Sequence, residues 1–365
     1  MNPEALSYRA TLAEYQQQAE AVFSALQSGD NAAQWRFKWM HPRFRGKPVV
    51  EVISAALDMT DAQLLIAREH YFENWEALKE FTQAVRSDVS VERFEKAVDA
   101  VVSGDVTTLR TLLQAHPELV HARSTRAHHA TLLHYLGANG VENYRQKTPP
   151  NAVEVAKLLL EAGAKPDALA DLYDHQCTTM SMLVSSCHPH EAGLQVALAE
   201  TLLDHGAALD GAGTNWQSAV LTSLKFGYLK TAEALVRRGA RIDNLVVAAG
   251  LGRVKEATDF LSTADSQSRH QALALAAQLG QTKTLKMLLD AGEDLNRHNP
   301  EGFHSHSTPL HQDVWADHLE AVKLLVEHGA RLDIRDTLYD STPLDWAKLG
   351  KREGIAGYLQ KHNAR

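Results

Sequence analysis

The chain has 365 residues, of which 44% are hydrophobic and 22% are charged, so it can bury a large core and is neither disordered nor collagen-like. Its 37 Lys and Arg against 45 Asp and Glu leave a net charge of −8, which excludes a general attraction to nucleic acid or anionic membranes. We expect a cytoplasmic protein, because the chain has only two cysteines and no secretory signal pattern after Met1. No apolar run reaches about 18 residues, so no membrane span is expected.

Helical spacing of apolar residues predicts that the first 90 residues form helices. One helix is expected between Leu12 and Leu26, and Ser28-Gly29-Asp30 marks its end. A second helical stretch starts at Asp61 and leads into residues 70–79.

A basic and aromatic segment lies between these two helical stretches. Residues 36–47 interleave five positive charges with three aromatic rings, a pattern that suits single-stranded nucleic acid. Because the whole chain carries −8, we instead expect a solvated basic loop whose aromatic rings pack beneath the helices. Nucleic acid is therefore not an expected partner.

One phrase recurs through the last three quarters of the chain. Its clearest copy runs from Thr308-Pro309-Leu310-His311 to Gly329-Ala330, and Thr342 begins it again. Threonine caps a helix, proline suits the first helical position, and glycine ends a helix, so each copy predicts a pair of helices. The copies begin near Phe94, Thr131, Thr179, Ser218, Asp243, Gln271 and Thr308, with a cap from Thr342.

These phrases resemble the ankyrin repeat, and the resemblance covers roughly residues 92–365. It implies an all-α solenoid of about seven helix-turn-helix repeats with short hairpin fingers and a carboxy-terminal cap over residues 91–365, behind a helical lid over residues 1–90. Residues 69–79 resemble the helical leader often attached to bacterial ankyrin proteins, which implies a bacterial source. The lid is expected to cover the apolar end of the array. Dimerisation through its first helix is the alternative, so monomer and dimer both stay open.

Departures from the repeat period predict where extra surface is built. Insertions are expected at residues 141–150 and 165–178, and a histidine-rich finger at residues 293–307. Between Gly227 and Gly280, successive turn glycines are only 25 and 28 residues apart, so fingers are expected to be missing there. Two prominent fingers would then flank a bare middle and form a cleft.

The histidines and cysteines do not predict a metal site, although the chain has 19 histidines. Cys177 and the segment Cys187–His190 lie at opposite ends of an expected helix, roughly 13 Å apart. We expect neither metal nor another cofactor, and leave open whether Cys187–His190 binds metal. His134 and His311 occupy the histidine position of the repeat phrase. There the resemblance implies hydrogen bonds to the neighbouring threonine and backbone.

No phosphate-binding loop, nucleophile elbow or zinc-protease motif is present in the sequence, so no catalytic residue is assigned. The resemblance implies a non-catalytic binding or scaffold module that recognises a protein through its concave face and fingers. The residues expected to contact that partner combine rigid aromatic rings with polar side chains. They are Tyr173, Asp174, His175, Trp216, His304, His306, Trp315 and Tyr339.

The alternative is a small-molecule enzyme or ligand-binding protein. Its cleft would lie between the fingers at residues 165–178 and 293–307, where histidines and aspartates gather. An enzyme is the less favoured of the two hypotheses because no catalytic motif accompanies these residues.

Overall fold

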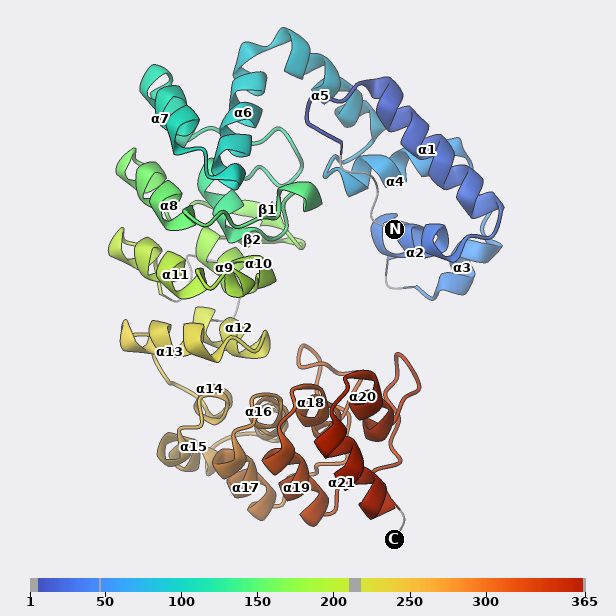
Figure 1. The fold of residues 1–365 in the computed structure, drawn as a ribbon, viewed down its shortest axis with the longest axis vertical. Coiled ribbons are helices and arrows are strands. Elements are labelled where there is room, and N and C mark those ends of the chain that lie inside the picture. Colours follow the sequence, from blue (N-terminus) through green and yellow to red (C-terminus); the bar gives the residue numbers. More distant parts are fainter. Residues whose placement is uncertain (1–5, 46, 210–217, 364–365) are drawn as a thin grey trace. The chain divides into compact units, whose positions relative to one another are not determined.

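The computed structural model describes residues 6–45, 47–209 and 218–363. The chain divides into two units, residues 1–216 and 217–365, and each is described by itself (Figure 1). In the described parts, every helix is too short or too polar to cross a membrane.

Five helices form the beginning of the first unit, and they share one core. Their bounds are α1 (Leu12–Gln27), α2 (Asn31–Met40), α3 (Val49–Ser54), α4 (Met59–Glu69) and α5 (Trp75–Ser87). Helix α1 begins where Thr11 accepts the backbone N–H of Glu14 and the Glu14 side chain accepts that of Thr11, a reciprocal cap. Tyr15 of α1, Leu65 of α4 and Phe81 of α5 are buried in this core. The helices expected in the first 90 residues are therefore present, and the predicted boundary at residues 90 and 91 stays a prediction.

Helix pairs make up the rest of the first unit. The bounds are α6 (Val89–Ser103), α7 (Val106–Ala115), η1 (Pro117–Val120), η2 (Leu132–Gly137), η3 (Asn143–Arg145), α8 (Ala152–Glu161), α9 (Thr179–Leu183), α10 (Cys187–Glu191) and α11 (Gln195–Asp204). The copy at Thr131, which lacks proline, forms a 3₁₀ helix in place of an α-helix.

A β-hairpin stands in the insertion at residues 165–178. Strands β1 (Ala170–Leu172) and β2 (His175–Cys177) pair antiparallel, with Leu172 opposite His175. Tyr173 and Asp174 form the tip with φ of 54° and 62°. Two successive positive φ values are typical of two-residue hairpin turns, because the twist of such a turn matches that of the strands on either side.

The second unit consists of two rows of helices. Its helices are α12 (Ala219–Lys225), α13 (Leu229–Arg237), α14 (Leu245–Gly250), α15 (Val254–Leu261), α16 (Ser266–Gln278), α17 (Thr282–Asp290), α18 (Pro309–Trp315), α19 (Leu319–Glu327), α20 (Pro343–Leu349) and α21 (Glu353–Asn363). Helices α14, α16, α18 and α20 pack side by side, and α15, α17, α19 and α21 form the second row (Figure 1). Helix α14 approaches α16 so closely that a Cβ on Gly250 would lie 2.7 Å from Leu275. The all-α solenoid of paired helices is therefore confirmed.

The histidine of the repeat phrase joins one helix pair to the loop that follows it. In α18, Thr308 Oγ1 lies 2.8 Å from His311 Nδ1, and His311 Nε2 lies 3.2 Å from the carbonyl oxygen of Ser341. His134 makes the same contacts with Thr131 and with the carbonyl oxygen of Ala168. Burial lowers the pKa of both histidines to about 4, so each ring is neutral and its Nε2–H donates to the carbonyl.

The middle of the second unit has the predicted short connections. Residues 238–244 and 262–265 link successive helix pairs directly, with no finger. The finger at residues 293–307 instead reaches α12, where Lys225 Nζ lies 4.9 Å from the ring centre of Phe303. The two connections therefore lack fingers, as predicted, and the bare middle itself stays a prediction.

Candidate functional site

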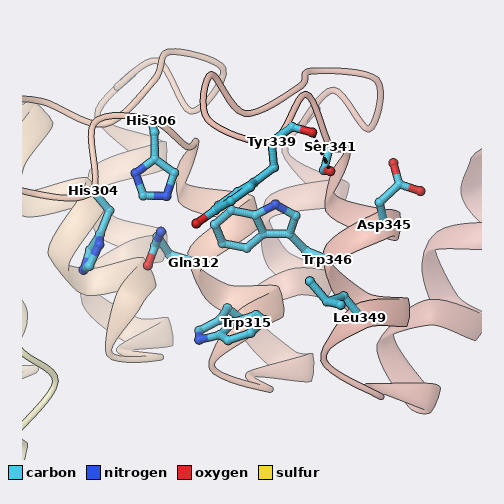
Figure 2. Close-up of a pocket in the computed structure, with 9 residues that line it drawn as sticks. All are labelled: His304, His306, Gln312, Trp315, Tyr339, Ser341, Asp345, Trp346 and Leu349. Atoms are coloured by element: carbon cyan, nitrogen blue, oxygen red, sulfur yellow. Dashed lines mark hydrogen bonds between the residues drawn. The ribbon is translucent and has the colours of Figure 1, made fainter. Parts of the chain in front are cut away.

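An aromatic pocket of about 500 Å³ lies in the second unit. Helices α18 and α20, the finger at residues 293–307 and the loop before α20 build it (Figure 2). The residues that line it are His304, His306, Gln312, Trp315, Tyr339, Ser341, Asp345, Trp346 and Leu349. Four of the eight predicted contact residues, His304, His306, Trp315 and Tyr339, therefore lie in one pocket.

Trp346 of α20 forms the buried wall of this aromatic pocket, with 8% of its surface exposed. Its indole Nε1 donates a hydrogen bond of 2.9 Å to Oδ2 of Asp336. The ring of Trp315 meets it edge-on, with centroids 5.9 Å apart and planes at 76°. The His311 ring packs against it at 5.1 Å. Hydrogen bond and ring contacts together fix the orientation of this indole.

Tyr339 stands on the loop before α20, with 72% of its surface exposed. The Asp336 carboxylate accepts the backbone N–H groups of Leu338, Tyr339 and Ser341 at 2.7 to 3.1 Å, which holds this loop in shape. Burial opposes the ionisation of Asp336, but its bonds from Trp346 and from these amides hold its pKa below the usual value. The exposed phenol is thus carried by an ordered loop.

Two further large apolar side chains are exposed at the aromatic pocket, Trp315 at 49% and Leu349 at 76%. Together with Tyr339 they surround Trp346 in Figure 2. Large exposed apolar side chains that gather at one place mark interaction sites more often than scattered ones do.

The two histidines come from the end of the long finger. His304 has a φ of 60°, and its ring centre lies 6.1 Å from that of His306. The carbonyl oxygen of His306 accepts the N–H of Thr337 at 2.8 Å, which ties the finger to the next loop. Burial, and secondly the neighbouring His306 ring, lowers the pKa of His304, so this ring is neutral at pH 7.

The remaining predicted contact residues lie elsewhere. Tyr173 and Asp174 form the hairpin tip and His175 begins β2, all in the first unit. The Tyr173 hydroxyl donates to Asn139 Oδ1 at 2.5 Å, and Asp174 pairs with Arg45 at 2.9 Å. Trp216 lies outside the described residues. The two predicted fingers belong to different units, so the cleft expected between them stays a prediction.

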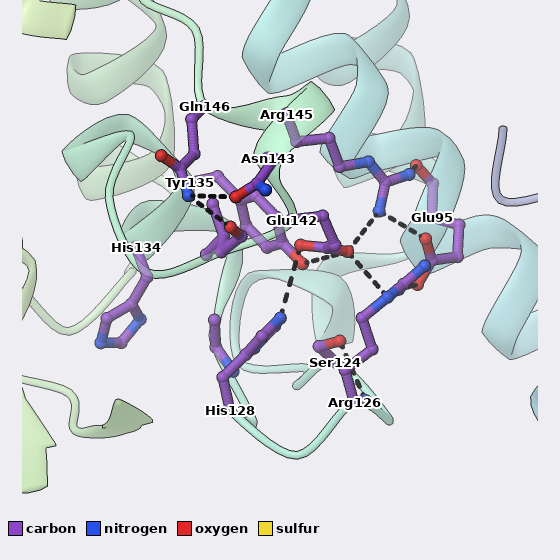
Figure 3. Close-up of polar contacts among 12 residues, drawn as sticks. Glu95, Ser124, Arg126, His128, His134, Tyr135, Glu142, Asn143, Arg145 and Gln146 are labelled. Atoms are coloured by element: carbon purple, nitrogen blue, oxygen red, sulfur yellow. Dashed lines mark hydrogen bonds and ion pairs between the residues drawn. The ribbon is translucent and has the colours of Figure 1, made fainter. Parts of the chain in front are cut away.

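Sequence reasoning missed a buried ionic cluster in the first unit (Figure 3). Arg126 and Arg145 pair with Glu95 and Glu142 at 2.5 to 3.0 Å, and all four residues are at most 2% exposed. His128 lies 3.4 Å from Glu142. Burial opposes ionisation, but the carboxylates raise the pKa of both arginines. The buried charges therefore compensate one another, and Arg145 also pairs with the partly exposed Asp99 at 2.7 Å.

This cluster corrects one expectation about the insertion at residues 141–150. Extra surface was expected there, but Val141, Glu142 and Arg145 are buried. The Arg126 guanidinium also lies 4.4 Å above the ring of Phe81 in α5, so the cluster connects the first helices to the repeats. Part of the insertion therefore belongs to the interior of the first unit, while Asn143, Lys147 and Pro150 are exposed.

The basic segment at residues 36–47 is only partly as expected. Phe37 and Phe44 are buried, whereas Trp39 is 60% exposed. Three of the five cations pair with carboxylates: Arg36 with Glu69, Arg45 with Asp174 and Lys47 with Glu51. The expectation that all its aromatic rings pack inward is wrong for Trp39, because it projects from the face of α2 opposite Phe37.

The two cysteines differ in burial and lie in different elements. Cys177 is buried with Sγ 3.7 Å from the carbonyl oxygen of Leu172, and Cys187 is exposed at the start of α10. Within the described ranges, no group of three or more His, Cys, Asp or Glu side chains is placed to hold a metal ion.

Comparison with known proteins bears on the repeats. Residues 273–365 match the family model of ankyrin repeats in three copies. The ankyrin repeat and KH domain-containing protein mask-1 of Caenorhabditis elegans is 26% identical over 221 residues, 58% of this chain and 8% of the relative. The ankyrin repeat and SOCS box protein 6 of Mus musculus is 40% identical over 76 residues, 21% of this chain and 18% of the relative. The chain thus spans less than a fifth of either relative. The recurring phrase, the paired helices and these matches together show ankyrin repeats over residues 273–365.

Proposed function

We propose that this chain is a non-catalytic binding module and that its aromatic pocket receives a side chain of a protein partner. Ankyrin repeats generally mediate contacts between proteins, which supports the broad class. The observation that carries the finer proposal is the gathering of Trp315, Tyr339 and Leu349, all exposed, around the fixed indole of Trp346.

Preorganisation supports this site over other exposed surfaces. A partner gains affinity when the rings it meets are already ordered, since less conformational entropy is then lost. Asp336 orders both Trp346 and the Tyr339 loop before any partner arrives. Truncation of such aromatic anchors costs about 2 kcal/mol or more in binding interfaces.

The polar groups of the pocket do not favour catalysis. The Ser341 hydroxyl donates to the carbonyl oxygen of Tyr339, and the Asp345 carboxylate caps α20 through Thr342. Neither side chain pairs with a lining histidine to form a nucleophile and base. The expected cytoplasmic location and bacterial source stay predictions.

The test is affinity capture with two matched double variants, followed by titration of the captured partner. The double variant Trp315→Ala with Tyr339→Ala removes two exposed rings of the pocket lining. The control, Trp35→Ala with Trp39→Ala, removes two exposed rings of the first unit. We expect the pocket variant to lose a partner that the control variant keeps, with a Kd at least about 30-fold weaker. Equal capture by both variants would show that the partner binds elsewhere.

A further inference from the structure

We propose that the aromatic pocket accepts a positively charged side chain, a lysine ammonium or an arginine guanidinium, from the partner. This inference rests on the proposed function and adds the chemistry of the group that enters. It is carried by three aromatic rings and one carboxylate in a pocket whose lining contains no lysine or arginine.

The three rings and the carboxylate all line this one pocket. Figure 2 shows Tyr339 and Trp315 on either side of the Trp346 indole, with Asp345 toward one end and the histidines toward the other. Aromatic faces attract cations through the negative potential of their π electrons, and tryptophan attracts them most strongly. Two of the three rings here are tryptophan.

Asp345 supplies the negative charge. Its Oδ2 accepts the hydroxyl and backbone N–H of Thr342 at 2.7 and 3.0 Å, and these bonds lower its pKa, so it is ionised at pH 7. Across the described ranges, no hydrogen bond to its Oδ1 is made. One carboxylate oxygen is therefore left to accept a donor from the ligand.

The cations near the pocket do not occupy it. Arg352 donates to the carbonyl oxygen of Trp315, and Arg335 pairs with Asp340 at 3.6 Å. Lys348 and Arg335 both act on Asp345 through their charge, but neither lines the pocket. The Asp345 carboxylate thus gives this lining a negative group that complements a cation.

A purely apolar side chain is the rival occupant, because Leu349 and the tryptophans would also accept one. The two differ in charge at nearly equal shape, so probes that differ only in charge separate them. Choline and its uncharged isostere 3,3-dimethyl-1-butanol form one such pair. N-acetyl-arginine amide and N-acetyl-leucine amide model the partner's side chain.

The experiment follows the indole N–H resonances of Trp315 and Trp346 in the full chain while each probe is added. We expect the arginine and choline probes to shift these resonances at concentrations at least about tenfold lower than their uncharged counterparts require. Asp345→Asn should weaken binding of the arginine probe by about fivefold, as expected when a partly exposed ion pair is lost. Asp333→Asn, which changes an exposed carboxylate outside the pocket lining, should leave it unchanged.

Two results would overturn the inference in different ways. Equal shifts by charged and uncharged probes would show an apolar occupant, and the proposed protein-binding function would stand. Shifts by choline with none by the arginine probe would assign the pocket to a free small cation and count against a partner side chain. A thermal unfolding curve of each variant identifies any loss of binding that misfolding causes. If Asp345→Asn misfolds, Tyr339→Leu replaces it as the test, because it removes one aromatic ring. Weaker binding of the charged probes alone supports the inference, and equally weaker binding of all probes contradicts it.

Discussion

Trp346 and Asp336 are joined by a hydrogen bond of 2.9 Å, from the indole Nε1–H to the carboxylate Oδ2. The same carboxylate accepts the backbone N–H of Tyr339 at 2.7 Å. One buried side chain therefore holds both the fixed wall of the aromatic pocket and the loop that presents its most exposed ring.

Replacing Asp336 with alanine should destabilise the second unit. Trp346 and the loop amides would lose their acceptor, which lowers the free energy of unfolding by about 2 kcal/mol. Its pKa is held below the usual 3.8, so its stabilisation is present above about pH 4 and is lost as the pH falls through the lowered value. Urea unfolding at pH 7 measures the effect, with Asp333→Ala as control. Equal stability of both variants would contradict this role.

Asp313 of α18 should make stability fall as the pH rises. Its side chain is fully buried, Oδ1 lies 3.3 Å from His318 Nδ1, and burial raises its pKa to about 7. The unfolded chain releases this proton near pH 4 and the folded chain near pH 7, so stability declines between these values. His318, whose pKa is raised by the hydrogen bond to Asp313, changes stability in the same direction.

We therefore expect Asp313→Asn to raise the free energy of unfolding at pH 8 by about 1–2 kcal/mol. The variant should then unfold at a higher urea concentration than the parent. At pH 5 the difference should shrink, because the parent carboxyl is then protonated when folded. Asp317→Asn, an exposed neighbour, is the control. A difference that is independent of pH would refute the assignment.

The repeat phrase predicted much of this architecture, because its signals are local. Thr308, Pro309 and His311 act within one turn, and their capping contacts are those expected. His304 and His306 were placed on a finger from spacing alone, and the finger brings them to Trp315 and Tyr339.

What sequence reasoning missed depends on contacts between distant segments. Trp346 was not singled out, because its partner Asp336 comes from across a loop. The ionic cluster was missed because Glu95 and Arg145, 50 residues apart, meet only after the insertion folds inward. Tyr173 and Asp174 share the composition of a contact site, but they lie on a hairpin of the first unit.

Arg145→Ala should destabilise the first unit strongly. The substitution leaves Glu95 and Glu142 buried with one arginine between them, and an uncompensated buried charge costs about 3–5 kcal/mol. Arg331→Ala removes an exposed pair and should change the free energy of unfolding by less than about 1 kcal/mol. Chemical unfolding followed by circular dichroism compares the two. A loss at Arg145 no larger than at Arg331 would mean that the cluster contributes little.

Photo-crosslinking from position 339 tests the central claim most directly, since it reports what occupies the aromatic pocket. The photoreactive residue p-benzoylphenylalanine replaces Tyr339 in one variant and Trp39, on the exposed face of α2, in the control. We expect irradiation of cells to join position 339, and not position 39, to one recurring protein, through a peptide that contains lysine or arginine at the joined site. Crosslinks to that protein from position 39 alone, or from neither position, would contradict it.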